Sequence, residues 1–442
     1  MVMEHQRPGG PRTLAARDEA AATLAEAVRT EVLARTVTGL VLLVPDPHAR
    51  FAAVGVGARF FADTVLEYGY GVCSYVFGWT PEREAIEAPV FRPYLEHYGD
   101  LRMRPDMATL APLPGQPGTW LVVCDVEWPD GSQVPIAPRS LLREQLEAAE
   151  AEGFVPSVGL EHEVTFIDSY GAPLTADGLD YAAGGLDAMH PLLANVQSDV
   201  DELDLGVESR RGECHPGQYE SVLGHRDALA ACDDAMMQQL AIRRAASAAG
   251  VRASYLAAER AGTGSSCHVH LSLSDVDGKP RFGELSVIEH FTAGVLTAAP
   301  DLTAIWAPTW NSYVRLRTGP FAPGEVRAGA DDRTAAVRIA GSQDSLRIEA
   351  RFAGADAQPH LVVGALLAAG MWGIREEVPM PQPGRLHDTP WEAVRALEHS
   401  ELARKLLGDA MVDARVALLN EEITSGLETV TDWQRTRGDR RV

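Results

Sequence analysis

The segment SLRIEARFAG, residues 345–354, restricts the fold more than any other part of the chain, because charged and apolar side chains alternate along it. Arg347, Glu349 and Arg351 take every second position, and apolar residues stand between and after them. Successive side chains of a β-strand point to opposite faces of the sheet. The segment therefore predicts a strand with one face suited to a core, and a second face that carries positive, negative and positive charge in turn.

Two more segments, GLEHEVTFID (159–168) and CHVHLSLSD (267–275), predict strands with the same alternation. A fourth segment, ECHPGQYE (213–220), places Glu213 and Glu220 on either side of a Pro-Gly turn. The polar faces of the two predicted strands carry Glu161, Glu163, His268, His270 and Ser272.

Each segment alone has an ordinary interpretation, a half-exposed strand whose charged face meets water. A His-x-His pair on a strand is likewise more typical of surface or hydrogen-bonded histidines than of metal ligands. Glutamate is nevertheless depleted in strands, and here it recurs in one predicted strand after another. If these faces converge, their carboxylates would repel one another unless cations neutralised them. A carboxylate-rich cluster with an imidazole suits Mg²⁺ or Mn²⁺, because these ions prefer oxygen ligands.

A set of arginines supplies the opposite charge. Guanidinium groups bind phosphate and carboxylate groups with two parallel hydrogen bonds, and divalent metals beside arginines are typical of phosphoryl transfer. The chain has no GxxxxGK[ST] segment, so a P-loop nucleotide site is not expected. The arginines in question are Arg315, Arg333, Arg338, Arg347 and Arg351.

The composition of the chain indicates which binding partners and which cellular compartment to expect. The 442 residues include 62 acidic and 39 basic side chains, a formal net charge of −23, which argues against a general affinity for nucleic acid or anionic membranes. The five cysteines form no CxxC pair and are odd in number, which favours reduced thiols in a cytosolic protein. Residues 1–12 lack the apolar run of a signal peptide, and the apolar segment 361–374 is too short to span a bilayer. We expect a cytoplasmic protein in which 361–374 is a buried helix.

The predicted helices and strands do not alternate regularly, which favours an α+β fold over a doubly wound sheet or a (β/α)8 barrel. We expect a flexible tail over residues 1–13, a small N-terminal domain over 14–110 and a large domain over 111–442. Apolar periodicity and helix stop signals predict helices over 14–35, 138–153 and 226–249, and strands over 39–44 and 119–126.

In order and spacing these segments resemble the glutamine synthetase superfamily. The resemblance rests on GLEHEVTFI, ECHPGQYE, GSSCHVHLSL, NSYVRL, DDRTAAVRI and RIEARFAGADAQPHL, and it extends over nearly all of residues 36–436. It implies a small β-grasp-type domain followed by a catalytic domain whose curved antiparallel sheet is flanked by helices. It also implies an ATP-dependent ligase, in which ATP phosphorylates the γ-carboxylate of glutamate and a nitrogen nucleophile displaces phosphate. A homododecamer of two stacked hexameric rings is implied as well.

Transferred motif by motif, the resemblance also implies roles for individual residues. One metal site would consist of Glu163, Glu213 and Glu220, and the second of Glu161, His268 and Glu349. His270, Ser272, Arg338 and Arg347 resemble contacts of the nucleotide, and Arg333, Arg338 and Arg351 resemble catalytic residues. Arg315 resembles the clamp for the α-carboxylate, Arg351 the partner of the γ-carboxylate, and Gly264 and Phe321 belong to the substrate site.

The nitrogen side departs from the family pattern. Ammonia-using members carry a flap with Gly-x-Glu-Ala-Pro, and here the run is GPFAP (319–323), with Phe321 in the place of the glutamate. The counterpart of an aspartate-containing turn in the N-terminal domain, EYGYGVCSY (67–75), has no aspartate. Capture of ammonium requires fixed negative charge, whereas a phenylalanine can cover the carbon portion of an organic amine. Neutral change in the flap, or compensation by Glu325, is the alternative explanation.

Two further replacements concern the acyl side. Thr263 stands where the family has asparagine, and Ser266 where it has glycine. The hypothesis that we favour is a ligase that forms a γ-glutamyl amide from glutamate, ATP and a primary amine, as in enzymes that act on polyamines or ethanolamine. The alternatives are an ammonia-using glutamine synthetase, a non-catalytic nucleotide-binding protein, and a hydrolase whose metal pair is the HVH segment.

Overall fold

The computed structural model describes residues 13–318, 321–323 and 325–441. The predicted tail therefore lies outside the described residues, apart from Thr13. Thr13 caps the first helix, since its hydroxyl accepts a hydrogen bond from the backbone N–H of Ala16. No helix in the described part of the chain is long and apolar enough to cross a membrane.

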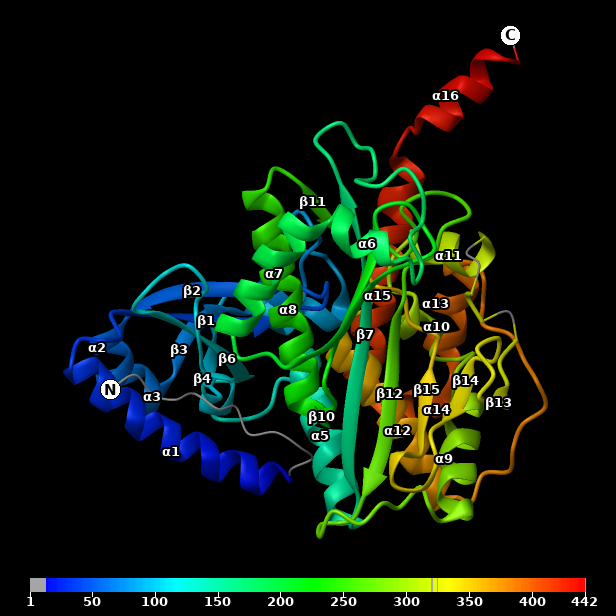
Figure 1. The fold of residues 1–442 in the computed structure, drawn as a ribbon. Coiled ribbons are helices and arrows are strands. Elements are labelled where there is room, and N and C mark those ends of the chain that lie inside the picture. Colours follow the sequence, from blue (N-terminus) through cyan, green and yellow to red (C-terminus); the bar gives the residue numbers. More distant parts are fainter. Residues whose placement is uncertain (1–12, 319–320, 324, 442) are drawn as a thin grey trace.

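The N-terminal part of the chain forms a sheet of six strands within the described residues, in the order β2-β1-β6-β4-β3, with β5 beside β6 (Figure 1). The strands are β1 (Gly39–Pro45), β2 (Phe51–Gly57), β3 (Tyr70–Cys73), β4 (Asp100–Pro105), β5 (Ala111–Pro112) and β6 (Thr119–Glu127). The boundary that was predicted at residue 110 cuts through this sheet, because β5 and β6 pair inside it. We propose that the boundary lies between β6 and the helix α5 (Pro138–Ala151).

The larger sheet has nine strands within the described residues, in the order β13-β14-β15-β12-β7-β9-β8, and β10 and β11 also pair with β7. Apart from the parallel pair β13–β14, its pairs are antiparallel, so the α+β expectation is confirmed. A (β/α)8 barrel, which the hydrolase alternative requires, is excluded. The strands are β7 (Val155–Ile167), β8 (Val207–Gly212), β9 (Gln218–Leu223), β10 (Arg226–Asp227), β11 (Arg252–Ser254), β12 (Cys267–Ser274), β13 (Ala328–Ala330), β14 (Val337–Ala340) and β15 (Arg347–Ala350).

Helices pack beside the sheets, and the long helices expected from the sequence are present. In Figure 1, α16 projects away from the rest of the chain. The α-helices are α1 (Leu14–Leu33), α2 (Ala58–Phe60), α3 (Leu66–Tyr68), α4 (Arg92–Leu95), α5, α6 (Ala183–Ala188), α7 (His190–Glu202), α8 (Ala228–Ala248), α9 (Leu285–Ala298), α10 (Thr303–Trp306), α11 (Ser312–Thr318), α12 (Pro359–Arg375), α13 (Pro390–His399), α14 (Glu401–Leu407), α15 (Asp409–Glu428) and α16 (Asp432–Asp439).

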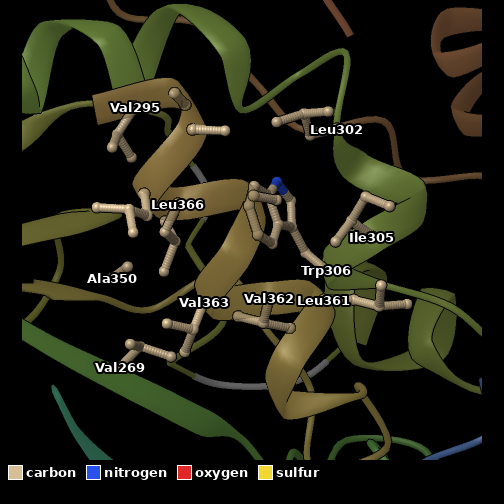
Figure 2. Packing of buried hydrophobic residues seen from close by; sticks show 14 of the residues in the cluster. Val269, Val295, Leu302, Ile305, Trp306, Ala350, Leu361, Val362, Val363 and Leu366 are labelled. Atoms are coloured by element: carbon tan, nitrogen blue, oxygen red, sulfur yellow. The ribbon is translucent and has the colours of Figure 1, made fainter. Parts of the chain in front are cut away.

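The apolar faces of the alternating strands form the core, as predicted. Val269 of β12 and Ala350 of β15 lie beside Val362, Val363 and Leu366 of α12 (Figure 2), and all five side chains are buried. The helix α12 begins with a proline, which suits the first turn because that position needs no donor. The predicted buried helix is therefore one of the helices that pack on the apolar side of the larger sheet.

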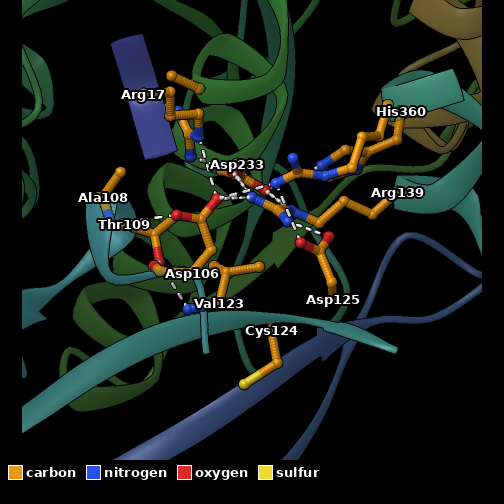
Figure 3. Close-up of polar contacts among 12 residues, drawn as sticks. Arg17, Asp106, Ala108, Thr109, Val123, Cys124, Asp125, Arg139, Asp233 and His360 are labelled. Atoms are coloured by element: carbon orange, nitrogen blue, oxygen red, sulfur yellow. Dashed lines mark hydrogen bonds and ion pairs between the residues drawn. The ribbon is translucent and has the colours of Figure 1, made fainter. Parts of the chain in front are cut away.

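A buried cluster of ion pairs joins the N-terminal part of the chain to the helices α5, α8 and α12 (Figure 3). Arg17 of α1 donates through Nε to Asp106 Oδ2 at 3.0 Å, and its Nη2 lies 3.2 Å from Asp233 Oδ2 in α8. Arg139 of α5 contacts both aspartates, and His360 Nε2 of α12 lies 3.0 Å from Asp233 Oδ1. Pairing of this kind offsets the cost of burying the charges.

Candidate active site

Strand register brings the predicted polar side chains onto one face of the larger sheet. His268 of β12 is directly opposite Glu161 of β7, His270 is opposite Glu349 of β15, and Glu349 is opposite Arg338 of β14. Residues directly opposite one another in antiparallel strands share a face and are close enough to interact. Four strands from three distant parts of the sequence therefore build one polar surface.

The same surface continues onto β9 and β8. Glu163 is opposite Glu220 of β9, and Glu220 is opposite Arg211 of β8. Arg211 places Nε 2.7 Å from Glu213 Oε1 and Nη2 3.0 Å from Glu220 Oε1. Sequence reasoning missed Arg211, whose guanidinium lies against two carboxylates that were assigned to one metal site.

The pKa values of these carboxylates show how crowded they are. Burial raises the pKa of Glu163 to about 7, and nearby Glu213 adds to the effect. Burial, with repulsion from Glu161 as the next cause, raises the pKa of Glu220 to about 9 even though Arg211 opposes the shift. Carboxylates placed so closely are stabilised in their ionised form by a divalent cation, so the donor set fits Mg²⁺ or Mn²⁺.

Hydrogen bonds hold Glu163 from both sides. Ser266 donates through its backbone N–H to Oε2 at 2.9 Å and through its hydroxyl to Oε1 at 2.7 Å. Gln218 donates to Oε2 at 2.7 Å and to the carbonyl oxygen of Gly264 at 2.8 Å. The serine that departs from the family pattern is thus a direct partner of a candidate metal ligand.

A second group of ligand atoms lies on β7, β12 and β15. Glu161, His270 and Glu349 each offer one ligand atom, and these three atoms lie within 4.8 Å of one another. The Nδ1 atom of His268 lies 3.5 Å from Glu161 Oε2 and 3.6 Å from Glu349 Oε1. Burial would raise the pKa of Glu161, but the two imidazoles lower it below its usual range. Both His268 and His270 therefore lie beside these carboxylates, whereas the sequence analysis predicted only His268 as a metal ligand.

The proton on His270 can be placed from its partners. Arg347 donates through Nε to His270 Nδ1 at 3.1 Å, and a guanidinium group has no acceptor. His270 Nδ1 is therefore the accepting nitrogen, and the hydrogen is on Nε2, which lies 2.9 Å from Glu161 Oε1. His270, Arg347 and Ser272 all line a cavity of about 510 Å³.

Of the four residues predicted to contact the nucleotide, Arg338 differs from the other three. It is not among the residues that line the 510 Å³ cavity. Its Nη1 lies 2.8 Å from Glu349 Oε2, and its guanidinium also contacts Asp331. In this structure it neutralises a candidate metal ligand.

A second cavity, of about 250 Å³, lies at the other end of the polar surface and shares Arg211 with the first. Arg315 and Arg351 are both buried in its wall. Arg315 donates to the carbonyl oxygens of Phe352 and Arg351, and among the described residues it has no carboxylate within ion-pair distance. The predicted residues that line this cavity are Glu163, Glu213, Glu220, Gly264, His268, Arg315, Phe321, Arg333 and Arg351.

One side of the smaller cavity was not predicted. Asp180 and Tyr181 line it together with Cys214 and Phe321. Asp180 Oδ2 lies 3.2 Å from Cys214 Sγ, the Arg211 guanidinium lies 5.0 Å from the centre of the Tyr181 ring, and Phe321 is 65% exposed. No periodic pattern marks these loop residues; the sequence signal was limited to Phe321.

Comparisons with known proteins agree with this geometry. The family described as "Glutamine synthetase, catalytic domain" matches residues 135–437. The chain is 34% identical to the gamma-glutamylethanolamide synthetase of Streptomyces coelicolor, over 98% of this chain and 100% of the relative. It is 30% identical to a glutamate–isopropylamine ligase of a Pseudomonas species, over 86% and 90% of the two chains. A solved structure titled "GmaS/ADP complex-Conformation 1" superimposes with a TM-score of 0.82 at 26% identity, covering 93% of this chain and 98% of that one.

Proposed function

The chain belongs to the glutamine synthetase family, and from this premise we propose that it joins the γ-carboxylate of glutamate to an organic primary amine. It is an ATP-dependent carbon–nitrogen ligase. The reaction consumes ATP and forms a γ-glutamyl amide by way of an acyl phosphate. One relative named for an ethanolamide product and one named for isopropylamine as a substrate support an organic amine over ammonium.

The two adjoining cavities suit the two halves of the first step. ATP would occupy the 510 Å³ cavity, where His270, Ser272 and Arg347 line the wall. Glutamate would occupy the 250 Å³ cavity, with its α-carboxylate on Arg315 and its γ-carboxylate towards Arg351. A buried guanidinium without a carboxylate partner is suited to bind a carboxylate of the substrate.

Divalent ions, Mg²⁺ or Mn²⁺, would be held by the carboxylates and the imidazole between these cavities. They supply neutralising charge for the phosphates and for the transferred group. Arg333, at the cavity wall, would stabilise the same group as phosphate leaves. The ligands in this proposal are Glu163, Glu213 and Glu220 for one ion, and Glu161, His268 and Glu349 for the other.

The observation that carries the choice of amine is the position of Phe321 at the edge of the smaller cavity. Its exposed ring can cover the carbon chain of an amine, which ammonium does not have. Asp180 lies on the same wall and provides negative charge for the nitrogen end. The nitrogen of an organic amine would thus lie near a carboxylate, and its carbon chain would contact the aromatic ring.

Phosphate release with a panel of nitrogen donors tests the proposal. With glutamate and ATP present, we expect release to depend on ethanolamine, isopropylamine or putrescine and hardly on ammonium, with the γ-glutamyl amide detected by mass spectrometry. Vigorous turnover with ammonium would identify an ordinary glutamine synthetase. ATP binding without turnover for any donor would identify a non-catalytic protein. The control is Glu289→Gln, an exposed glutamate on α9 outside both cavities.

Assembly and location complete the proposal. A homododecamer of two stacked hexameric rings in the cytoplasm accords with the family resemblance. The exposed apolar side chains Val430 and Trp433, next to and within the projecting helix α16, support an association between copies. Mass photometry of the purified chain tests the number of subunits.

A further inference from the structure

A third cavity, of about 410 Å³, shares no lining residue with the two cavities of the active site. The turn between β1 and β2, residues 47–50, forms one wall, and residues of β11 and α15 form others. The cavity therefore lies where the N-terminal part of the chain meets the catalytic part. Its volume is in the range of pockets that hold small molecules.

Arg415 of α15 lines this cavity, and it is only 3% exposed. Its Nη2 donates to the carbonyl oxygen of Ala304 at 3.4 Å, whereas its Nε has no hydrogen-bond partner among the described residues. Within the described chain no carboxylate lies at ion-pair distance from it. Burial lowers the pKa of Arg415 to about 10, which reflects a charge without a close counter-ion. Such a group is expensive to bury unless something else pairs with it.

Two other buried donors in the same wall also lack partners. Gln239 of α8 is 4% exposed and Tyr255 is 6% exposed. In the part of the chain that the structure describes, neither Gln239 Nε2 nor the Tyr255 hydroxyl has a hydrogen-bond partner. Native proteins satisfy nearly all such groups with protein, water or a ligand. The cavity therefore has three buried polar side chains with unused hydrogen-bonding atoms.

Acidic groups line another part of the same cavity. Asp356 uses Oδ2 to accept hydrogen bonds from Ser312 and Thr309, both at 2.6 Å, but its Oδ1 accepts none from the residues that the structure describes. Glu422 accepts from the backbone N–H of Trp310 at 3.0 Å. Neither carboxylate pairs directly with Arg415. Positive and negative groups thus line one space without neutralising each other at contact distance.

We propose that this cavity is a second ligand site, which binds a small zwitterion of the amino-acid type. Its carboxylate pairs with Arg415 and accepts hydrogen bonds from Gln239 and Tyr255. Its ammonium group pairs with Asp356 and Glu422. A carboxylate or an amine alone would satisfy only one part of the wall, and water would leave the charges unpaired.

Binding of glycine, L-alanine, acetate, methylamine and inorganic phosphate to the full chain tests this proposal, by calorimetry and by thermal shift. We expect saturable binding and a rise in Tm for the two amino acids, and no comparable effect of the other three compounds. Because an amino acid can also reach Arg315 in the active site, the same titrations are made with Arg315→Ala. We expect binding to the third cavity to survive that change.

Two variants assign the binding to the cavity. Ser425→Trp fills it from an exposed lining position and should abolish the binding. Arg415→Met should weaken binding by about ten- to hundredfold, because a charged hydrogen-bond partner is lost. Without ligand, Arg415→Met should melt no lower than the wild type, since an unpaired buried charge is removed. If Arg415→Met does not fold, Gln239→Leu replaces it.

Three results would overturn the proposal. The first is the absence of saturable amino-acid binding by the Arg315→Ala protein. The second is binding that Ser425→Trp and the Arg415 or Gln239 variant leave unchanged. The third is equal binding of acetate or phosphate, which would make the cavity a simple anion site.

Discussion

Replacement of Asp106 by asparagine should remove a defined part of the stability that the buried ion-pair cluster provides. Asp106 is fully buried, and its Oδ1 accepts a hydrogen bond from the backbone N–H of Ala108 at 3.1 Å. Asparagine keeps an oxygen for that bond and nearly the same shape. Asp106→Asn therefore removes the negative charge that faces Arg17 and Arg139, together with the hydrogen bonds that Oδ2 accepts from both guanidinium groups.

The pKa of Asp106 gives the magnitude. Burial alone would raise this pKa, but Arg17 and Arg139 lower it from 3.8 to about 2. The lowering of the pKa from 3.8 in the unfolded chain to about 2 in the folded chain corresponds to about 2 kcal/mol of stability. Because the folded value is the lower one, this stability is present above about pH 4 and is lost as the pH falls towards 2. The variant lacks it at every pH.

Denaturant unfolding followed by tryptophan fluorescence measures this difference at pH 7, 5, 4 and 3. We expect the gap between wild type and Asp106→Asn to be about 2 kcal/mol at pH 7 and to shrink as the pH approaches 2. Asp63→Asn is the matched control, since its exposed ion pair with Arg59 contributes little. A gap that stayed constant with pH, or one within error of the control, would refute the reasoning.

The remaining predictions concern the active site. Glu213→Gln combined with Glu220→Gln should weaken Mn²⁺ binding by at least about a hundredfold, measured by calorimetry, since loss of even an outer partner of a metal ligand costs ten- to a hundredfold; unchanged Mn²⁺ affinity would place the metal elsewhere. Arg315→Lys should raise the KM for glutamate about tenfold without changing the KM for ATP, because lysine cannot bind a carboxylate with two parallel hydrogen bonds, and a parallel rise in both constants would contradict a specific role. Phe321→Glu should raise phosphate release with ammonium and lower kcat/KM for isopropylamine about tenfold or more, because it exchanges apolar contact for charge; steady-state kinetics with both donors decide this.

The sheet and the residues on its polar face could be predicted because side chains alternate with a period of two. That rule placed Glu161, His268 and Glu349 on polar faces, and strand pairing brought those faces together. The position of Arg211 on this polar face could not be predicted from alternation. The register of β8 against β9 shifts between Val207 and Ser209, so strict alternation does not carry through that strand.

Other features could not be predicted because they depend on how distant segments meet. Asp180 and Tyr181 lie on a loop, and a bridge between Asp180 and Gly212 holds that loop beside β8. A boundary at residue 110 would divide the smaller sheet, because β6 returns to pair with β1 across a long stretch of intervening chain. The third cavity likewise combines residues from β1–β2, α8 and α15. Local sequence patterns do not indicate which distant segments come into contact.

The strand alternation has a consequence for how enzymes of this kind can diversify. Along β12 the same backbone register places His268 and His270 on the polar face of the sheet and Val269 in the core. Insertion of a single residue there would reverse both sets together, so folding and chemistry must be lost or retained as one. Asp180 and Phe321 lie outside these ladders. Under the proposed function, changes in these loops can therefore alter the choice of amine while the strands that carry the acid-activating residues keep their register.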